Sequence, residues 1–254
     1  MARNITNKVV VITGAAEGLG LVMADNFLQK GAKTVVILDI NEKLGTEAVR
    51  TLNSKYGDGK AAFYKCDVIT DLETISKKLF DVYKTVDVLI NNAGILNDFA
   101  VKQTININVL ALIEWSNKFW ENMRIDKGGK GGTIINLASI YGFRVDQYLP
   151  VYQASKFAVM GFTRSLGHPY NYERSGVRVV AICPGFTVTK LVTDVKASND
   201  QLVQRDWEAF VKGNLWQKPE SVGKATIEVY ERADSGTAWL TEGGKPIVEV
   251  PYVA

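Results

Sequence analysis

The sequence is poor in the residues from which disulfides and metal sites are built. Its 254 residues include two cysteines, Cys66 and Cys183, and a single histidine, His168. Each cysteine follows an apolar run typical of a buried strand, so we interpret both as reduced thiols of a protein kept in a reducing compartment, the cytoplasm. Because His168 has no second histidine and no cysteine beside it, the sequence predicts no metal site.

Long apolar runs and concentrated charge are also missing. No apolar run reaches the roughly 18 residues that a membrane-spanning helix needs, and residues 1–7 lack the apolar core of a signal peptide. The net charge is only +3 and contains no basic run, which argues against nucleic acid as a partner. With 46% hydrophobic and 22% charged residues, the composition is that of an ordinary globular protein.

What the sequence does contain is an alternation of short β-branched runs and helical patterns. Continuous apolar runs of this kind are typical of strands buried on both faces of a parallel sheet. The alternation therefore predicts one α/β domain over residues 1–254, built on a doubly wound parallel sheet. The predicted strands cover residues 8–13, 34–38, 61–65, 86–90, 133–138, 177–182 and 238–240, and the predicted helices cover 21–28, 42–56, 72–83, 103–123 and a segment starting at Pro150.

A glycine-rich turn separates the first predicted strand from its helix. Gly14, Gly18 and Gly20 are spaced Gly-x-x-x-Gly-x-Gly, which is related to the dinucleotide pattern Gly-x-Gly-x-x-Gly but distinct from it. Glycine permits a tight turn and a close approach to the backbone, while the helix N-terminus offers free N–H groups to a phosphate. A strand, a glycine turn and a helix in this order predict a dinucleotide site.

Acidic residues near this turn favour NAD over NADP. Asp39 ends the second predicted strand, where a carboxylate accepts hydrogen bonds from the ribose hydroxyls and repels a 2′-phosphate. Glu17 adds a second negative charge inside the turn, and the residues after Asp39 are Ile40 and Asn41 rather than arginine or lysine. Without the glycine turn, Asp39 would be better explained as a helix cap.

A second pattern points to acid/base chemistry. Tyr152 and Lys156 are four residues apart, which places both side chains on one face of a helix. A free phenol has a pKa of about 10, and a nearby ammonium lowers it toward neutral pH. Ser139, at the end of an apolar strand, is suited to hold a substrate oxygen against Tyr152. Alone, a Tyr-x-x-x-Lys pair is more often a solvated helix face, so this interpretation depends on the other motifs.

Taken together, the motifs resemble the short-chain dehydrogenase/reductase family over essentially the whole chain and in the family's order. The segments 161–165, 175–186 and 236–240 are most similar to 15-hydroxyprostaglandin dehydrogenases, and the last also resembles insect-type alcohol dehydrogenases. The resemblance implies a Rossmann-type sheet of about seven strands with helices on both faces. The motifs are Thr13-Gly14-x-x-x-Gly18-x-Gly20, Asp67-Val68, Asn91-Asn92-Ala93-Gly94, Ser139, Tyr152-x-x-x-Lys156 and Pro184-Gly185.

The resemblance also implies roles for individual residues. Tyr152 would be the catalytic acid/base, Lys156 would hold the nicotinamide ribose and lower the tyrosine pKa, and Ser139 would position the substrate oxygen. Asn108 would complete a catalytic tetrad by holding a water that links Lys156 to solvent; a helix-kink or packing role is the alternative. The cofactor site would comprise Gly14, Glu17, Gly18, Leu19, Gly20, Asp39, Ile40, Cys66, Asp67, Val68, Asn91, Asn92, Ala93, Gly94, Tyr152, Lys156, Pro184, Gly185, Phe186 and Thr187.

The activity implied is transfer of a hydride between an alcohol and NAD. Residues 186–216 interrupt the strand–helix alternation with many apolar and aromatic side chains. We interpret them as a lid over a pocket for a lipophilic, secondary alcohol, although core and dimer packing explain them equally well. Leu149 stands where prostaglandin dehydrogenases carry a glutamine, which argues against prostaglandin itself unless Tyr148 replaces that contact. The predicted substrate contacts are Ser139, Leu149, Tyr152, Phe186 and Leu191.

Two further questions stay open at this level. A carbonyl reductase of the same family, or a member that binds NAD without catalysis, would share these motifs, although non-catalytic members usually lack the tyrosine or lysine. Relatives usually pair as homodimers or homotetramers through the long helix, on which Trp115 and Trp120 lie here. Core packing explains these two tryptophans equally well.

Overall fold

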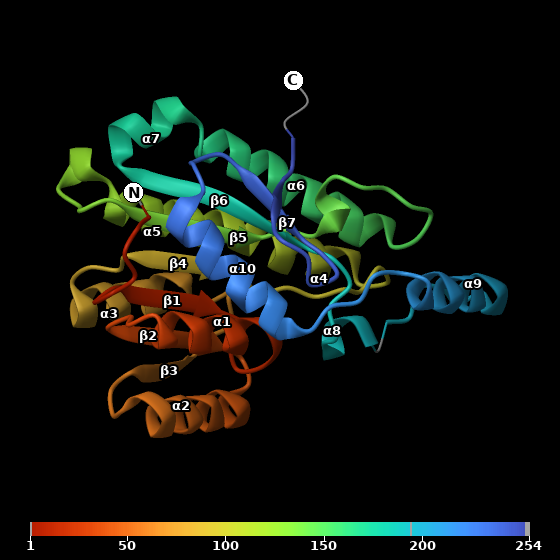
Figure 1. Ribbon diagram of the computed structural model, residues 1–254, viewed down its shortest axis with the longest axis horizontal. Coiled ribbons are helices and arrows are strands. Elements are labelled where there is room, and N and C mark those ends of the chain that lie inside the picture. Colours follow the sequence, from red (N-terminus) through yellow and green to blue (C-terminus); the bar gives the residue numbers. More distant parts are fainter. Residues whose placement is uncertain (1, 194, 252–254) are drawn as a thin grey trace.

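The computed structural model describes residues 2–193 and 195–251, and in this part of the chain one sheet runs through the molecule (Figure 1). Its eight strands have the order β3-β2-β1-β4-β5-β6-β7-β8. Every pairing is parallel except the last, between β7 and β8, which is antiparallel. The strands are β1 (Val9–Thr13), β2 (Thr34–Asp39), β3 (Ala61–Lys65), β4 (Val88–Asn91), β5 (Gly132–Leu137), β6 (Val177–Pro184), β7 (Ala238–Thr241) and β8 (Val248–Glu249).

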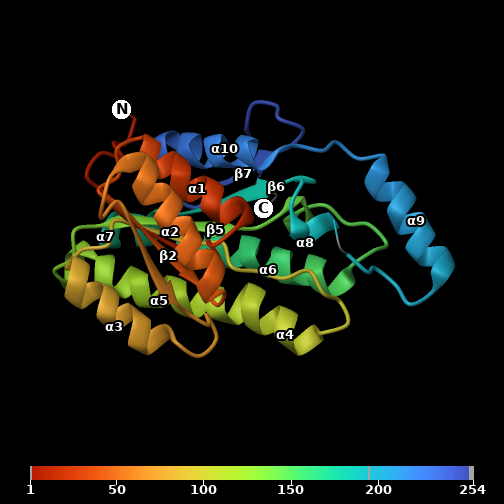
Figure 2. The same cartoon turned by 90° about the horizontal axis from the view of Figure 1, so that it is seen from below.

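Helices cover both faces of the sheet, as Figure 2 shows. One layer contains α1, α2 and α10, and the opposite layer contains α3, α5 and α6. The doubly wound α/β fold expected from the sequence is therefore confirmed. The helices are α1 (Gly18–Gln29), α2 (Glu42–Tyr56), α3 (Leu72–Tyr83), α4 (Val101–Ile105), α5 (Leu112–Met123), α6 (Pro150–Leu166), α7 (Pro169–Ser175), α8 (Lys190–Thr193), α9 (Gln201–Lys212) and α10 (Pro219–Arg232).

The central strands are buried on both faces, which explains their unbroken apolar sequences. All five residues of β1 are buried. Because successive side chains of a strand point to opposite faces, Val10 and Ile12 pack with the core that includes Phe27 of α1. Val9 and Val11 pack with the opposite core, which contains Trp115 and Phe119 of α5.

The order of the strands creates a switch point between β1 and β4. The chain runs outward from β1 to β2 and β3, then returns to β4 on the other side of β1. In open parallel sheets, ligands bind at the carboxyl ends of the strands where the order reverses. The segments that follow β1, β2, β4, β5 and β6 all begin at this edge.

Several elements differ from the sequence prediction. The long helix predicted for 103–123 contains a π-helical segment, Asn106–Ala111, between α4 and α5. The short strand β8 and the helices α7, α8, α9 and α10 were not predicted. His168 lies after α6 and caps α7, where its Nδ1 accepts a hydrogen bond from the Tyr170 amide at 3.2 Å.

A buried arginine joins the sheet to the end of α10. Arg178, the second residue of β6, is only 1% exposed. Its guanidinium donates to the carbonyl oxygens of Tyr230 (2.7 Å) and Ala233 (2.6 Å) and to the hydroxyl of Thr133 (3.1 Å). Burial lowers the pKa of Arg178 to about 10. The cation thus satisfies carbonyl groups that the end of a helix leaves unpaired.

Candidate active site

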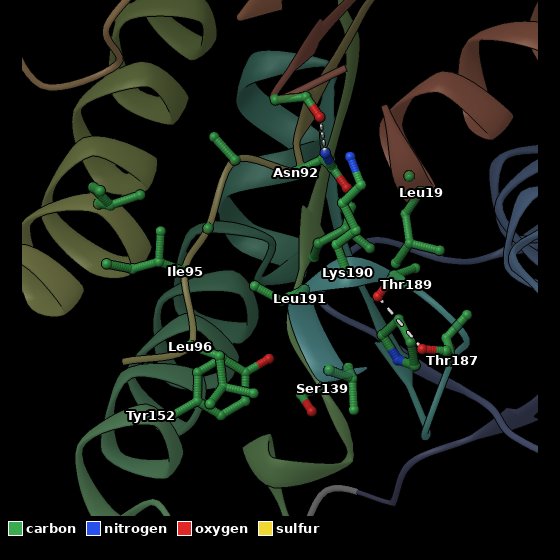
Figure 3. A pocket seen from close by; sticks show the side chains of 18 of the residues that line it. Leu19, Asn92, Ile95, Leu96, Ser139, Tyr152, Thr187, Thr189, Lys190 and Leu191 are labelled. Carbon is green, nitrogen blue, oxygen red and sulfur yellow. Dashed lines mark hydrogen bonds between the residues drawn. The ribbon is translucent and has the colours of Figure 1, made fainter. Parts of the chain in front are cut away.

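A cavity of about 700 Å³ lies at the carboxyl ends of the strands. Figure 3 shows part of its lining, with Leu19 beside the glycine turn and Tyr152 and Ser139 at the opposite end. Most of the predicted site residues meet here. Those that line the cavity are Gly14, Glu17, Gly18, Leu19, Asp39, Ile40, Cys66, Asp67, Val68, Asn92, Ala93, Gly94, Ser139, Tyr152, Lys156, Pro184, Gly185, Phe186, Thr187 and Leu191.

Four predicted residues lie behind the lining instead. The Asn91 amide is turned into the core, where it donates to Ser116 Oγ (2.8 Å) and Asn136 Oδ1 (2.9 Å). A Cβ on Gly20 would lie 2.5 Å from the Gly14 carbonyl oxygen, so this glycine serves the packing of the turn. Leu149 is 1% exposed and packs in an apolar cluster rather than lining the cavity, so its role as a substrate contact stays a prediction. Asn108 is also buried.

The glycine turn is shaped to receive a phosphate. Gly14 and Gly18 have positive φ angles of 62° and 59°, which favour glycine. A Cβ on Gly18 would meet nothing within 4 Å, so the backbone faces open space. The first turn of α1 has no side-chain cap, and its N–H groups stay available to an anion. This geometry fits the diphosphate of a dinucleotide.

The turn is braced by the segment that follows β4. Thr13 Oγ1 accepts hydrogen bonds from the amides of Asn92 and Ala93, both at 3.1 Å. The Asn92 side chain donates in return to the Gly14 carbonyl at 2.7 Å. A Cβ on Gly14 would lie 2.8 Å from the Ala93 Cα, so this close contact requires glycine. The turn and the segment therefore form one rigid wall of the cavity.

The Asp39 carboxylate is held at the end of β2. Its Oδ2 accepts from the Ala16 amide and its Oδ1 from the Asn41 amide, each at 2.9 Å. Both oxygens keep a lone pair for another donor, and the carboxylate lines the cavity. This arrangement fits a pair of ribose hydroxyls.

An ion pair that was not predicted crosses the cavity beside the turn. Lys190 Nζ, in α8, lies 2.7 Å from Glu17 Oε2, and both residues line the cavity. Both side chains are largely exposed, so the pair adds little to stability. The pair links the segment after β6 to the glycine turn.

Tyr152 and Ser139 meet at the inner end of the cavity (Figure 3). Tyr152 is 7% exposed, and burial raises the pKa of its phenol to about 12, while hydrogen bonding with Ser139 acts in the opposite direction. Lys156 Nζ donates to the Leu137 carbonyl at 2.8 Å and lies 5.5 Å from the centre of the Tyr152 ring. Burial lowers the pKa of Lys156 to about 8.

The expectation that Lys156 lowers the tyrosine pKa is not met in the protein alone. Desolvation of the phenolate is the largest influence on the pKa of Tyr152, and the net shift is upward. The ammonium is bonded to a carbonyl of β5, over the ring rather than at the hydroxyl. A phenolate therefore requires further positive charge in the cavity.

Asn108 ties two walls of the site together. Its Nδ2 donates to the Ile95 carbonyl (2.9 Å) and to Ser155 Oγ (3.1 Å), and its Oδ1 accepts from the Ile95 amide (2.9 Å). It lies in the π-helical segment, and such segments often occur at functional sites. Its side chain is thus occupied by protein, in agreement with the packing alternative, while its part in a tetrad stays a prediction.

An aromatic cluster forms the far wall. Phe186 contacts Trp216 with a ring-centre distance of 5.6 Å, and Trp207 contacts Tyr148 at 5.3 Å. Trp207 is the one buried residue of α9 and reaches the cavity, whereas Tyr148 is buried without lining it. Tyr148 therefore does not reach the cavity here, and its role as a substitute substrate contact stays a prediction. In both ribbon views α9 lies away from the main body (Figures 1 and 2).

The fold and this cavity are typical of α/β enzymes that bind nucleotides. Sequence comparison identifies the family within this class. A family model described as short chain dehydrogenase matches residues 8–200. The chain belongs to the short-chain dehydrogenase family, whose members are oxidoreductases that act on small molecules with a nicotinamide cofactor.

Individual relatives are similar over most of their length. Alcohol dehydrogenase 1 of Ceratitis cosyra is 35% identical over 95% of this chain and 94% of its own. The 15-hydroxyprostaglandin dehydrogenase [NAD(+)] of Macaca fascicularis is 37% identical over 82% of this chain and 79% of its own. The structure of levodione reductase superposes with a TM-score of 0.80 over 95% of this chain and 98% of its own; at 23% identity this shows the fold alone.

Other lining residues were missed from the sequence. Ile95 and Leu96 follow the asparagine motif, and Tyr141 lies two residues after Ser139. Their position next to predicted site motifs was the one indication in the sequence that they line the cavity. Gln103 reaches the cavity from α4, and no sequence signal marked it. In the part of the chain that the structure describes, no helix is long and apolar enough to cross a membrane.

Proposed function

We propose that the protein is an NAD-dependent alcohol dehydrogenase that oxidises lipophilic, secondary alcohols. The observation that carries this proposal is the position of the Tyr152 and Ser139 hydroxyls, in the same cavity as the glycine turn and the Asp39 carboxylate. A hydride acceptor bound along the turn and an alcohol beside Tyr152 would then share one enclosed space.

The protein's own part in the reaction is to manage a proton and orient the alcohol. Tyr152, as phenolate, accepts the proton of the alcohol hydroxyl, and Ser139 hydrogen-bonds the same oxygen as it becomes a carbonyl. Lys156 holds the nicotinamide ribose and keeps a positive charge near the phenolate. NAD⁺ supplies the acceptor for the hydride. Because Tyr152 is buried, the proton exchange is shielded from bulk water.

The proposal of NAD over NADP rests on negative charge. Asp39 and Glu17 both line the cavity near the glycine turn, and a 2′-phosphate beside Asp39 would be repelled. The prostaglandin dehydrogenase relatives carry NAD(+) in their names. The residue after Asp39 is Ile40, which is 64% exposed and offers no charge to a phosphate.

The proposal of a lipophilic substrate rests on the aromatic wall. We assign residues 186–216, which include α8 and α9, as a lid whose inner side presents Phe186, Leu191 and Trp207 to the cavity. Apolar surface of this kind favours a hydrocarbon group over water by about 25 cal/mol per Å² buried. The relatives act, by their names, on alcohols and on hydroxyprostaglandin.

The test is turnover on a panel of alcohols, followed as absorbance at 340 nm. We expect reduction of NAD⁺ with secondary lipophilic alcohols such as terpenoids, steroids or prostanoids, and little with short primary alcohols or with NADP⁺. NAD binding is measured separately by titration. Preference for small polar alcohols contradicts the lid assignment, and preference for NADP⁺ contradicts the role of Asp39. NAD binding without any turnover contradicts the dehydrogenase proposal.

We also propose a homodimer formed through the helix layer that contains α5 and α6. Phe157 on α6 and Leu110 in the π-helical segment are 42% and 47% exposed, respectively. Trp115, by contrast, is 1% exposed and belongs to the core. Sedimentation of the wild type should show a dimer, and F157E should weaken it. A monomeric wild type contradicts the proposal.

The compartment proposed for this enzyme is the cytoplasm. Cys66 and Cys183 are both buried and unpaired. Burial raises the pKa of each thiol to about 12, so both stay protonated and unreactive in the folded protein. Recovery of the protein in the membrane or secreted fraction of its cells would contradict this assignment.

A further inference from the structure

The helix that carries Tyr152 does not cap its own N-terminus. Leu149 occupies the N-cap position, where its side chain has no hydrogen-bonding atom. Its backbone is left-handed, with φ of 54° and ψ of 49°. The first N–H groups of a helix have no partner within the helix and require one from elsewhere. Tyr152 is the third residue of α6, so its own amide is among them.

The partner comes from a distant part of the chain. Asp98 Oδ2 accepts a hydrogen bond from the Val151 amide at 2.7 Å, and Asp98 Oδ1 accepts one from the Tyr152 amide at 3.0 Å. Both carboxylate oxygens are thus used on two successive amides of the first turn. A negative charge is also favourable at this end of a helix, where the helix dipole is positive.

Asp98 lies two residues after the segment 92–96 that forms one wall of the cavity. This segment begins at Asn92, which is bonded to the glycine turn, and Ile95 is held by two hydrogen bonds to Asn108, both 2.9 Å. Each of these contacts is independent of Asp98. The cofactor side of the wall is therefore anchored on its own, whereas the start of α6 has Asp98 as its cap.

We propose that Asp98 is a positioning residue of the active site, whose carboxylate sets the first turn of α6, and with it the Tyr152 hydroxyl, against the wall that holds the cofactor. Asp98 itself does not line the cavity, so it acts through Tyr152. The change in kcat expected for Asp98 variants rests on the proposed dehydrogenase function. The change expected in their hydrogen–deuterium exchange does not.

Variants at Asp98 separate positioning from simple stabilisation. A displacement of the reacting group by 1 Å costs about 100-fold in rate. We expect D98A to lower kcat by about 10- to 100-fold while the Kd for NAD changes less than about twofold. In D98N one oxygen can still accept a hydrogen bond, so D98N should recover part of the lost kcat.

Asp87 provides a matched control at the amino ends of the strands, directly before β4. Its carboxylate accepts from the Val9 amide at 2.8 Å and from Lys8 Nζ at 2.9 Å, which is a similar pair of contacts far from the cavity. D87A should lower the melting temperature and leave kcat unchanged. Equal effects of D87A and D98A on kcat at matched folded fractions would overturn the proposal, as would wild-type kcat in D98A or loss of NAD binding in D98A.

Hydrogen–deuterium exchange supplies a readout without turnover. A peptide covering residues 149–156 should exchange faster in D98A than in wild type or D87A, and D98N should fall between them. Unchanged exchange in both Asp98 variants overturns the proposal. If the wild type oxidised no alcohol, the proposed function would fail by itself, and exchange would still decide the role of Asp98. If D98A does not fold, the comparison is made with D98N.

Discussion

Replacement of Tyr152 by phenylalanine is expected to lower turnover by about 10²- to 10⁴-fold, the contribution typical of a positioned acid/base. Binding of NAD should change by less than about twofold, because the ring keeps its edge-on contact with Tyr141, with ring centres 6.2 Å apart. The substitution removes one hydroxyl from a buried position and leaves the apolar packing intact. Absorbance at 340 nm measures turnover, and a NAD titration measures binding.

Y148F is the matched control for this experiment. Tyr148 is a buried tyrosine of the same aromatic cluster, yet it does not line the cavity. Its variant should keep turnover within about threefold of wild type. Wild-type turnover in Y152F would remove the acid/base assignment, and loss of NAD binding in Y152F would show that the change reaches beyond the proton transfer.

Replacement of Lys156 by methionine should abolish most activity and yet make the protein more stable at pH 7. Lys156 is 6% exposed, and burial lowers its pKa to about 8. At pH 7 the side chain is therefore a buried ammonium, which donates one hydrogen bond to the Leu137 carbonyl. Lowering the pKa from its ordinary value to about 8 costs about 3 kcal/mol of unfolding free energy. Methionine removes this cost but leaves the Leu137 carbonyl unpaired, at about 1–2 kcal/mol. The net gain is about 1–2 kcal/mol.

The stability difference should depend on pH with a defined sign. Above pH 8 the native Lys156 loses its proton before the unfolded chain does, so the unfolded state binds more protons and the wild type becomes relatively more stable. The advantage of K156M should therefore shrink between pH 8 and about pH 10. The shift at Cys66 is common to both proteins and cancels in the difference, whereas Cys183 interacts with Lys156 and its pKa rises slightly further in K156M.

Urea unfolding at pH 7 and pH 9.5 measures this difference. K43M, at an exposed position of α2, controls for the substitution itself and should show no such change. An advantage of K156M that stays constant over this range would mean that burial does not hold the lysine pKa low. A destabilised K156M at pH 7 would mean that the ammonium is a net stabiliser of the fold.

Much of the site was predictable because parallel strands place their carboxyl ends at one edge. Gly14, Asp39 and Ser139 are far apart in sequence, yet each lies at the carboxyl end of a strand, so the strand prediction alone brings them together. The boundaries of α2, α3 and β3 were predicted as observed, since their apolar patterns are clean and their ends carry turn residues.

The missed features fall into two groups with different causes. The helix α10 has a recognisable sequence pattern, with Pro219 at its start and buried Val222, Thr226 and Val229 at helical spacing, so it was predictable from the sequence. The contacts of Asp98 with α6 and of Glu17 with Lys190 join residues 53 to 173 positions apart, and no local pattern encodes them. The two-residue strand β8 exists only through its pairing with β7.

The tyrosine pKa shows a further limit of sequence reasoning. The spacing of four residues correctly places Tyr152 and Lys156 on one helix. The prediction from that spacing, however, considered only the charge of the ammonium and left out the burial of both groups. Burial acts on both groups and pushes each toward its neutral form, the phenol upward and the amine downward. How deeply a side chain is buried depends on the whole fold, which a single motif does not contain.

The switch point between β1 and β4 separates the two halves of the cavity, so each half can be engineered on its own. Asp39 ends β2, and Ser139 follows β5, three strand spacings away, which is about 14 Å. Substitutions separated by more than about 7–10 Å without shared partners usually have additive effects on free energy. Under the proposed function, a designer can therefore retune the nucleotide preference on one half of the sheet and the substrate preference on the other, and combine the best variant of each without screening every pair.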